Sequence, residues 1–232
     1  MYDLGKGSSL NYAQEVTAAL HVIIGQLKRY LGVERVRLLD VPCGDLQWMH
    51  RFLLTRSDVD YTGVDIVADV ISRHRAAFRG RPWKFVNMDV VTQPINVSEY
   101  DLIMTRMMMQ HLAQGDVIRV LHNFSNITDH QYRPVFLLAT TFSNTKVNMQ
   151  MKVNSSRRFE LFNLEISPFR LQTPLCLFRD GPPRSGHYMG LWRLPLGVIS
   201  ESNCNKPVTV SSSLSKRPMY SCINWTLPIY TG

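Results

Sequence analysis

The sequence has few cysteines, no long apolar run and none of several familiar ligand-binding patterns. Its 232 residues include four cysteines, and no two of them form a C-x-x-C pair. Neither a metal site nor a small disulfide framework is therefore indicated. No segment approaches the roughly 20 consecutive apolar residues of a membrane span, and the first residues lack the basic and then apolar order of a signal peptide. We therefore expect a soluble protein of the cytoplasm or the nucleus, with reduced thiols and no membrane partner.

The charge balance excludes an acidic protein but does not identify a partner. Hydrophobic residues make up 45% of the chain and charged residues 19%, so a sizeable core can form. The formal net charge of +8 favours anionic partners. The basic residues are scattered, apart from a group that we interpret as the solvated face of a helix followed by a turn: Arg73, His74, Arg75, Arg79, Arg81 and Lys84. Nucleic acid is not specifically indicated.

Short apolar runs alternate with segments of helical periodicity over the first 142 residues. The pattern predicts strands over 35–41, 60–65, 84–89, 100–106 and 134–142, and helices over 11–31, 46–54, 66–78 and from Gly115 onward. Asn11 and Gly32 are the predicted cap and stop of the first helix. This order predicts an α/β fold, doubly wound, in which helices cover both faces of a mostly parallel sheet.

The rhythm changes after residue 142. Residues 144–156 are polar and predict a long loop, and 176–192 predict a closing hairpin around 181–183. We expect one domain over 1–195 and a poorly ordered tail over 196–232, where the chain becomes rich in serine, proline and lysine.

Three predicted strands end in an acid at a regular spacing. Asp40, Asp65 and Asp89 follow one another at intervals of 25 and 24 residues, and Gly44 lies in the first loop. Ligands of a doubly wound sheet bind outside the carboxyl ends of its strands, so we expect these acids at one crevice. An acid after the second strand can accept hydrogen bonds from ribose hydroxyls, and one after the third can accept from an adenine amine.

The absent glycine motifs narrow the choice of nucleotide. A dinucleotide site prefers G-x-G-x-x-G after the first strand, and a phosphate loop reads G-x-x-x-x-G-K-[ST]. Only Gly44 is present in the first loop. A ligand that contains adenosine but no phosphate, S-adenosylmethionine, fits better, while a nucleotide oxidoreductase of similar architecture is the less favoured alternative.

The first loop also carries a resemblance to a known family. Residues 40–49 read Asp-Val-Pro-Cys-Gly-Asp-Leu-Gln-Trp-Met. From Gly5 to Trp192 the chain resembles the class I S-adenosylmethionine-dependent methyltransferases, and within them a group whose first loop reads Asp-x-Pro-Cys-Gly-Asp-x-x-Trp-Met. The resemblance implies a Rossmann-like, seven-stranded sheet whose last strand is antiparallel.

The resemblance also implies residue roles. The 40–45 loop would hold the methionine part of the cofactor, Asp65 the ribose and Asp89 the adenine end. Thr105 to Met107 would face the reacting methyl group. The full set of predicted cofactor-binding residues is Asp40, Pro42, Cys43, Gly44, Asp45, Trp48, Asp65, Ile66, Asp89, Val90 and Thr105.

Two departures separate the chain from these relatives. They usually carry an acid after the arginine of the fourth-strand loop, where this chain has Met107, and an Asn-x-Asp and a Gly-x-Trp-Arg-Pro segment in the loop after the fifth strand. We interpret Met107 to Met109 as adaptable packing under the cleft. A cofactor-binding module that has lost catalysis therefore stays open as an alternative to an enzyme.

His111 and Arg106 are the predicted catalytic residues. Imidazole titrates close to neutral pH, so His111 is a candidate general base, and Arg106 could orient an acidic acceptor through two hydrogen bonds. The chain has no Asp/Asn-Pro-Pro-Tyr/Phe segment after the fourth strand and no evident Lys/Asp/Lys/Glu set. We therefore expect methyl transfer to an oxygen or nitrogen of a small molecule or a protein side chain.

Overall fold

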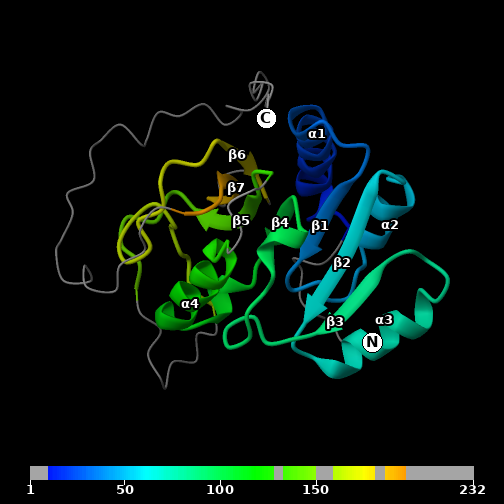
Figure 1. Cartoon of the computed structure of the whole chain (residues 1–232). Coiled ribbons are helices and arrows are strands. Elements are labelled where there is room, and N and C mark those ends of the chain that lie inside the picture. The colour runs from blue at the N-terminus through cyan, green and yellow to red at the C-terminus, as the bar shows by residue number, and fades with distance from the viewer. Residues whose placement is uncertain (1–9, 128–132, 150–158, 181–185, 197–232) are drawn as a thin grey trace.

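A seven-stranded sheet forms the centre of the molecule (Figure 1). The computed structural model describes residues 10–127, 133–149, 159–180 and 186–196. Within these ranges the strands follow the order β3-β2-β1-β4-β5-β7-β6. Their bounds are β1 Val36–Asp40, β2 Val59–Asp65, β3 Lys84–Asn87, β4 Leu102–Thr105, β5 Phe136–Phe142, β6 Cys176–Arg179 and β7 His187–Arg193.

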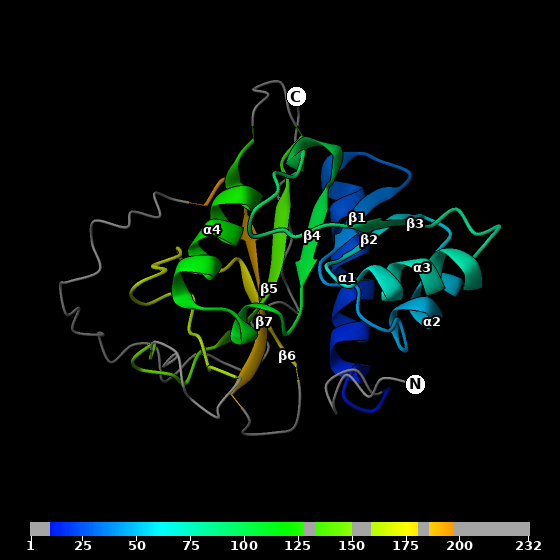
Figure 2. The same ribbon diagram turned by 90° about the horizontal axis from the view of Figure 1, so that it is seen from below.

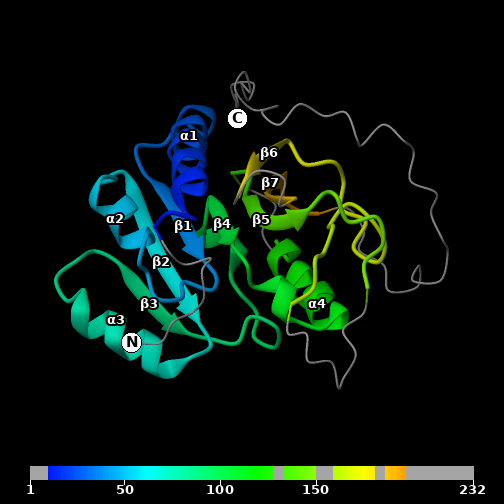
Figure 3. The same cartoon turned by 180° about the vertical axis from the view of Figure 1, so that it is seen from behind.

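Five strands run parallel and one edge is antiparallel. β1 pairs in parallel with β2 and β4, β2 with β3, and β4 with β5, whereas β7 is antiparallel to both β5 and β6. The predicted parallel sheet, its antiparallel last strand and the closing hairpin are confirmed. The hairpin's turn lies outside the described residues. Views from opposite sides show β3 and β6 at the two edges (Figures 1 and 3).

Helices cover both faces of this sheet. α1 (Gln14–Leu31), α2 (Met49–Leu54) and α3 (Ala68–Ala77) lie on one side, and α4 (Gln114–Ser125) lies on the other (Figure 2). The short 3-10 helices η2 (Val97–Glu99) and η3 (Met109–His111) follow β3 and β4. The doubly wound prediction is therefore confirmed.

The first helix begins later than its sequence suggested. α1 begins at Gln14 after the N-cap residue Ala13, whose side chain makes no capping hydrogen bond, so the predicted cap at Asn11 is wrong. Gly32 ends the helix as predicted, with a φ of 63° and its N–H donated to the carbonyl of Lys28. Glycine tolerates this left-handed conformation without a Cβ penalty.

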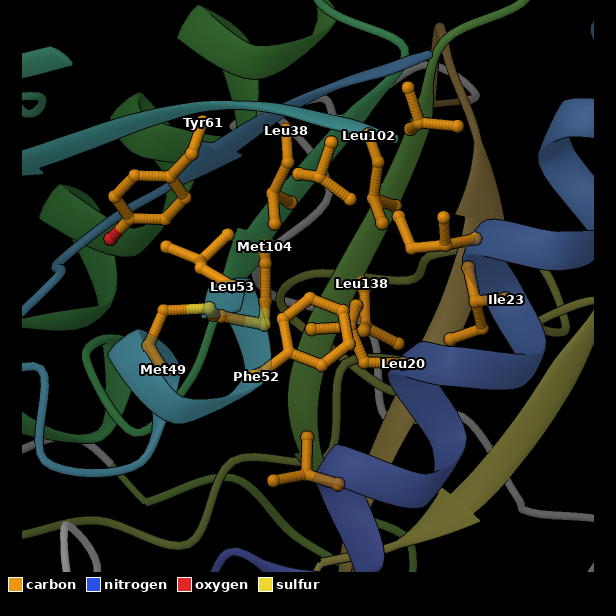
Figure 4. Packing of buried hydrophobic residues seen from close by; sticks show 14 of the residues in the cluster. Leu20, Ile23, Leu38, Met49, Phe52, Leu53, Tyr61, Leu102, Met104 and Leu138 are labelled. Carbon is orange, nitrogen blue, oxygen red and sulfur yellow. The ribbon is translucent and has the colours of Figure 1, made fainter. Parts of the chain in front are cut away.

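Two apolar clusters, one on each face, fix the sheet. On the first face Leu20 and Ile23 of α1 and Phe52 of α2 pack toward the strand residues Leu38 and Leu138 (Figure 4). On the second face α4 packs with the segment 162–171, and all seven positions of β5 between the two clusters are buried. Burial on both sides is why β4 and β5, which are buried at every position, read as nearly continuous apolar runs.

The described chain extends to Leu196, one residue past the predicted domain boundary. Leu196 belongs to the second cluster and its N–H donates to the Ser125 hydroxyl. The predicted tail lies outside the described residues from residue 197 on. Within the described ranges, the structure contains no helix that is long and apolar enough to cross a membrane.

Candidate functional site

One cavity opens where the parallel strands end. It has a volume of about 520 Å³, within the usual range for small-molecule sites. Asp40 is the last residue of β1, Asp65 the last of β2, and Asp89 follows the end of β3 by two residues. All three line this cavity, together with Arg106, which follows β4 directly.

The structure brings together nearly all of the predicted site residues. Both predicted catalytic residues and ten of the predicted cofactor-binding residues line the cavity: Asp40, Pro42, Cys43, Gly44, Asp45, Trp48, Asp65, Ile66, Asp89, Val90, Arg106 and His111. Thr105 does not. It is buried in β4, and its hydroxyl has no hydrogen-bond partner among the residues that the structure describes.

Apolar side chains complete the lining: Val41, Val64, Met88, Val91, Met104, Met107, Met108, Leu112 and Phe159. Met107 and Met108, which were expected as packing at the cleft, line it directly. Most of the others are chain neighbours of predicted residues. Phe159 reaches the cavity from a distant segment, and no motif marks it.

The Gly44 peptide is held on both sides. Its φ is 56°, and its N–H donates to Asp65 Oδ2 at 3.2 Å. Its carbonyl lies 2.7 Å from Nε2 of His74, a buried residue of α3. A glycine suits this left-handed position. The interpretation of His74 as part of a solvated basic face was wrong, because its ring lies beneath the first loop, 5.3 Å from the Phe85 ring.

Asp40 is a buried acid whose carboxylate accepts a hydrogen bond from a neutral hydroxyl group. The Tyr61 hydroxyl donates to its Oδ2 at 2.8 Å, and the residue is 3% exposed. Burial raises the pKa of Asp40 to about 7, although the Tyr61 hydrogen bond and the charge of Arg106 act in the opposite direction. Burial likewise raises the pKa of the Cys43 thiol. Cys43 is therefore a neutral wall of the cavity and not a nucleophile.

The other acids differ in how much of their hydrogen-bonding capacity is used. Asp65 accepts the N–H groups of Gly44 and Val67, so each oxygen keeps a further lone pair. Asp45 Oδ2 is buried and has no partner within the described structure. Asp89 accepts from the Val91 N–H and the Thr92 hydroxyl, which makes it a turn residue as well as a lining residue.

Arg106 is held by a second, buried acid. Its guanidinium contacts both carboxylate oxygens of Asp180 at 2.8–3.0 Å, and the side chains are 9% and 1% exposed. It also lies over the Trp48 ring at 5.6 Å and donates to the carbonyl of Tyr12. The two-pronged contact that was expected for a substrate is therefore made to Asp180.

His111 ends η3 at the edge of the cavity. Its ring is exposed to solvent and meets the Phe159 ring edge-on, at a centroid distance of 5.2 Å. This placement is compatible with proton uptake from an acceptor that enters from this side. In the part of the chain that the structure describes, no three His, Cys, Asp or Glu side chains are grouped to hold a metal ion.

Comparisons with known proteins agree with this geometry. Residues 38–131 match the family described as "Methyltransferase domain". The 1,6-didemethyltoxoflavin-N1-methyltransferase of Burkholderia thailandensis, solved with 1,6-didemethyltoxoflavin and S-adenosylhomocysteine, is 16% identical with a TM-score of 0.56. The alignment covers 79% of this chain and 78% of that one. The sequence matches none of the curated proteins.

Two further solved structures share the fold. An S-adenosylmethionine-dependent methyltransferase of Methanosarcina mazei is 13% identical with a TM-score of 0.51, over 72% of this chain and 96% of that one. A protein of Pyrococcus horikoshii is 13% identical with a TM-score of 0.50, over 82% and 93%. At these identities the likeness concerns the fold.

Strand order, cavity and domain match together define the class. The chain has the fold of the class I S-adenosylmethionine-dependent methyltransferases, whose cofactor is S-adenosylmethionine. The segment that matches the methyltransferase domain, residues 38–131, runs from within β1 through β4 and α4.

Proposed function

We propose that the chain binds S-adenosylmethionine in this cavity and transfers its methyl group to an oxygen or nitrogen of a small molecule or a protein side chain. The observation that carries the proposal is the convergence of Asp40, Asp65 and Asp89 on one cavity beside the left-handed Gly44. A row of acceptors at neighbouring strand ends suits a ligand that is rich in donors and bears a cationic centre.

The residues present fit this cofactor. Asp65 would accept the ribose hydroxyls with its remaining lone pairs. Asp45 Oδ2, buried and unpartnered among the described residues, would accept from the methionine ammonium. Val90 and Asp89 would bound the adenine. When bound, the cofactor supplies a methyl group whose bond to sulfur breaks as the bond to the acceptor forms, with the electron pair staying on sulfur.

His111 would take up the proton that an oxygen or nitrogen acceptor releases. It lines the cavity at the β4 side and is exposed to water, so the proton can pass on to solvent. Arg106 would act through position, because Asp180 already occupies its guanidinium.

One observation favours a second candidate, a cofactor-binding module without turnover. Asp180 occupies the Arg106 guanidinium. Among the lining residues that the structure describes, the proposal therefore assigns only His111 a direct action on the acceptor. Transfer of labelled methyl from S-adenosylmethionine to any compound of a metabolite panel would eliminate this candidate.

Calorimetry with S-adenosylhomocysteine tests the proposed cofactor site. Asp65→Ala should weaken binding by about 1–3 kcal/mol, because ribose hydroxyls in the cavity lose their acceptor. Asp65→Asn keeps one oxygen acceptor in place of the two that receive the Gly44 and Val67 N–H groups, so it should lose less affinity than Asp65→Ala. Asp60→Ala removes a half-exposed acid from β2, paired with Arg35, and should bind like the parent. Unchanged affinity in a folded Asp65→Ala protein would refute this assignment.

A further inference from the structure

We propose that the part of the cavity beside β4 binds an uncharged, planar aromatic methyl acceptor. This substrate class rests on the proposed function, since it assigns the other part of the same cavity to the cofactor. It narrows the acceptor to small molecules that carry their nucleophilic oxygen or nitrogen on or next to a ring.

The strand order separates two chemically different halves of the cavity. The acids that line it belong to the loops of β1, β2 and β3, which are neighbours in the sheet. The next strand, β4, leads into a run of apolar lining residues, Met107, Met108 and Leu112, and Phe159 lines the same cavity. The ring of Phe159 contacts His111 of this run, so it belongs to the β4 half.

The β4 half offers no free counter-charge to an ionic acceptor. Among the described residues that line the β4 half, Arg106 has the permanently charged side chain. Asp180 neutralises this charge through both of its carboxylate oxygens. A desolvated carboxylate or ammonium without a partner is costly to bury. An anion would also lie near the acids of the cofactor half. An uncharged acceptor avoids both penalties.

Met107 is kept in a conformation that disfavours its own residue type. Its φ is 57°, a left-handed position where asparagine, aspartate and glycine are favoured. The Thr140 hydroxyl accepts its N–H at 2.9 Å and fixes the turn. Backbone strain of this kind concentrates at ligand sites. Met107 lines the cavity, so this strained position places a methionine in the cavity wall.

Methionine and phenylalanine together suit a flat aromatic ring. Thioether sulfurs make favourable contacts with aromatic rings and adapt to their shape. The Phe159 ring is held edge-on by His111 at 5.2 Å and by Phe142 at 5.9 Å. These two contacts fix the orientation of the Phe159 ring at the cavity, and aromatic rings pair favourably with other aromatic rings.

The test compares three probes that share one ring system. The full chain is saturated with S-adenosylhomocysteine, which keeps the probes out of the cofactor half, and is titrated calorimetrically with 2-naphthol, 2-naphthoate and 2-naphthylmethylammonium. We expect one site for 2-naphthol and dissociation constants about tenfold higher for both ions, since neither finds a counter-charge. Equal or tighter binding of either ion would overturn the inference.

A pair of matched variants tests whether the preference for an uncharged ligand depends on Met107. Met107→Asp suits the left-handed backbone and should fold, but it adds a negative charge to the β4 half. We expect it to bind 2-naphthol about tenfold more weakly and 2-naphthylmethylammonium more tightly. Met149→Asp makes the same change at a side chain that is 63% exposed and outside the cavity, and should leave all three affinities unchanged.

The outcomes separate this inference from the function on which it rests. If S-adenosylhomocysteine does not bind, the proposed function fails and the acceptor class fails with it. If S-adenosylhomocysteine binds but 2-naphthol binds no more tightly than the two ions, the acceptor class alone is wrong. The same holds if Met107→Asp changes the affinities no more than Met149→Asp does. Binding of 2-naphthol that Met107→Asp weakens supports both.

Discussion

At the scale of single residues, Asp40 makes the charge of the cofactor half of the cavity depend on pH near neutrality. Because burial raises its pKa to about 7, it loses its proton between about pH 6 and pH 8. We expect the affinity for S-adenosylmethionine, whose sulfur is cationic, to rise over this range about threefold more than that for S-adenosylhomocysteine, whose sulfur is neutral. The two ligands share the same amino acid part, so the ratio of their calorimetric dissociation constants isolates the sulfonium charge.

Asp40→Asn should make that ratio independent of pH, whereas Asp60→Asn should preserve the parent's slope. A parent protein in which the affinities for both ligands change equally with pH would contradict the assignment.

The raised pKa of Asp40 also has a consequence for stability. Between about pH 4 and pH 7 the folded carboxyl holds a proton that the unfolded one has lost, so its contribution to stability falls as the pH rises. The free energy of unfolding of Asp40→Asn should therefore depend less on pH in this range.

At the scale of elements, the Arg106–Asp180 pair joins the loop after β4 to the residue after β6. These strands are separated in the sheet by β5 and β7. Asp180→Leu or Arg106→Met should each lower the free energy of unfolding by about 3–5 kcal/mol, because each leaves a buried charge without its partner. The double variant Arg106→Met/Asp180→Leu should recover most of the loss. Urea unfolding of the four proteins measures this cycle.

The exposed pair of Arg35 and Asp60 provides the control. Its side chains are 44% and 52% exposed, so Arg35→Met should cost at most about 1 kcal/mol. Equal costs at the two pairs, or additive losses in the double variant, would show that the buried pair is not a coupled unit.

The elements also show what local sequence could and could not predict. β1 and β2 were predictable because short buried segments bounded by turns recur in alternation with helical segments, and each ends in an acid. Thr105 was wrongly expected at the cavity because adjacent strand residues face opposite sides, and Met104 is the one that lines it. The Asp180 contact spans 74 positions, and no local period reports such a distance.

At the scale of the whole molecule, charge is distributed unevenly. The chain carries a formal charge of +8, yet Asp40, Asp45, Asp65 and Asp89 all line the cavity. The exposed basic side chains of α3 and of the segment after it, including Arg73, Arg79 and Arg81, lie outside the lining. The surface charge is therefore a poor guide to the ligand, and the cavity should disfavour phosphates.

This distribution predicts which adenosine ligand stabilises the fold. S-adenosylhomocysteine at about 100 times its dissociation constant should stabilise the protein by about 2.7 kcal/mol and raise its melting temperature by about 5–10 °C. NAD at the same concentration should produce a much smaller shift, because its pyrophosphate would meet the acids around the single glycine, Gly44. Thermal unfolding of the parent and of Asp65→Asn measures both effects, with Asp60→Asn as the matched control. A shift with NAD as large as that with S-adenosylhomocysteine would instead favour a nucleotide oxidoreductase, since the same cavity would then have to accommodate two phosphates.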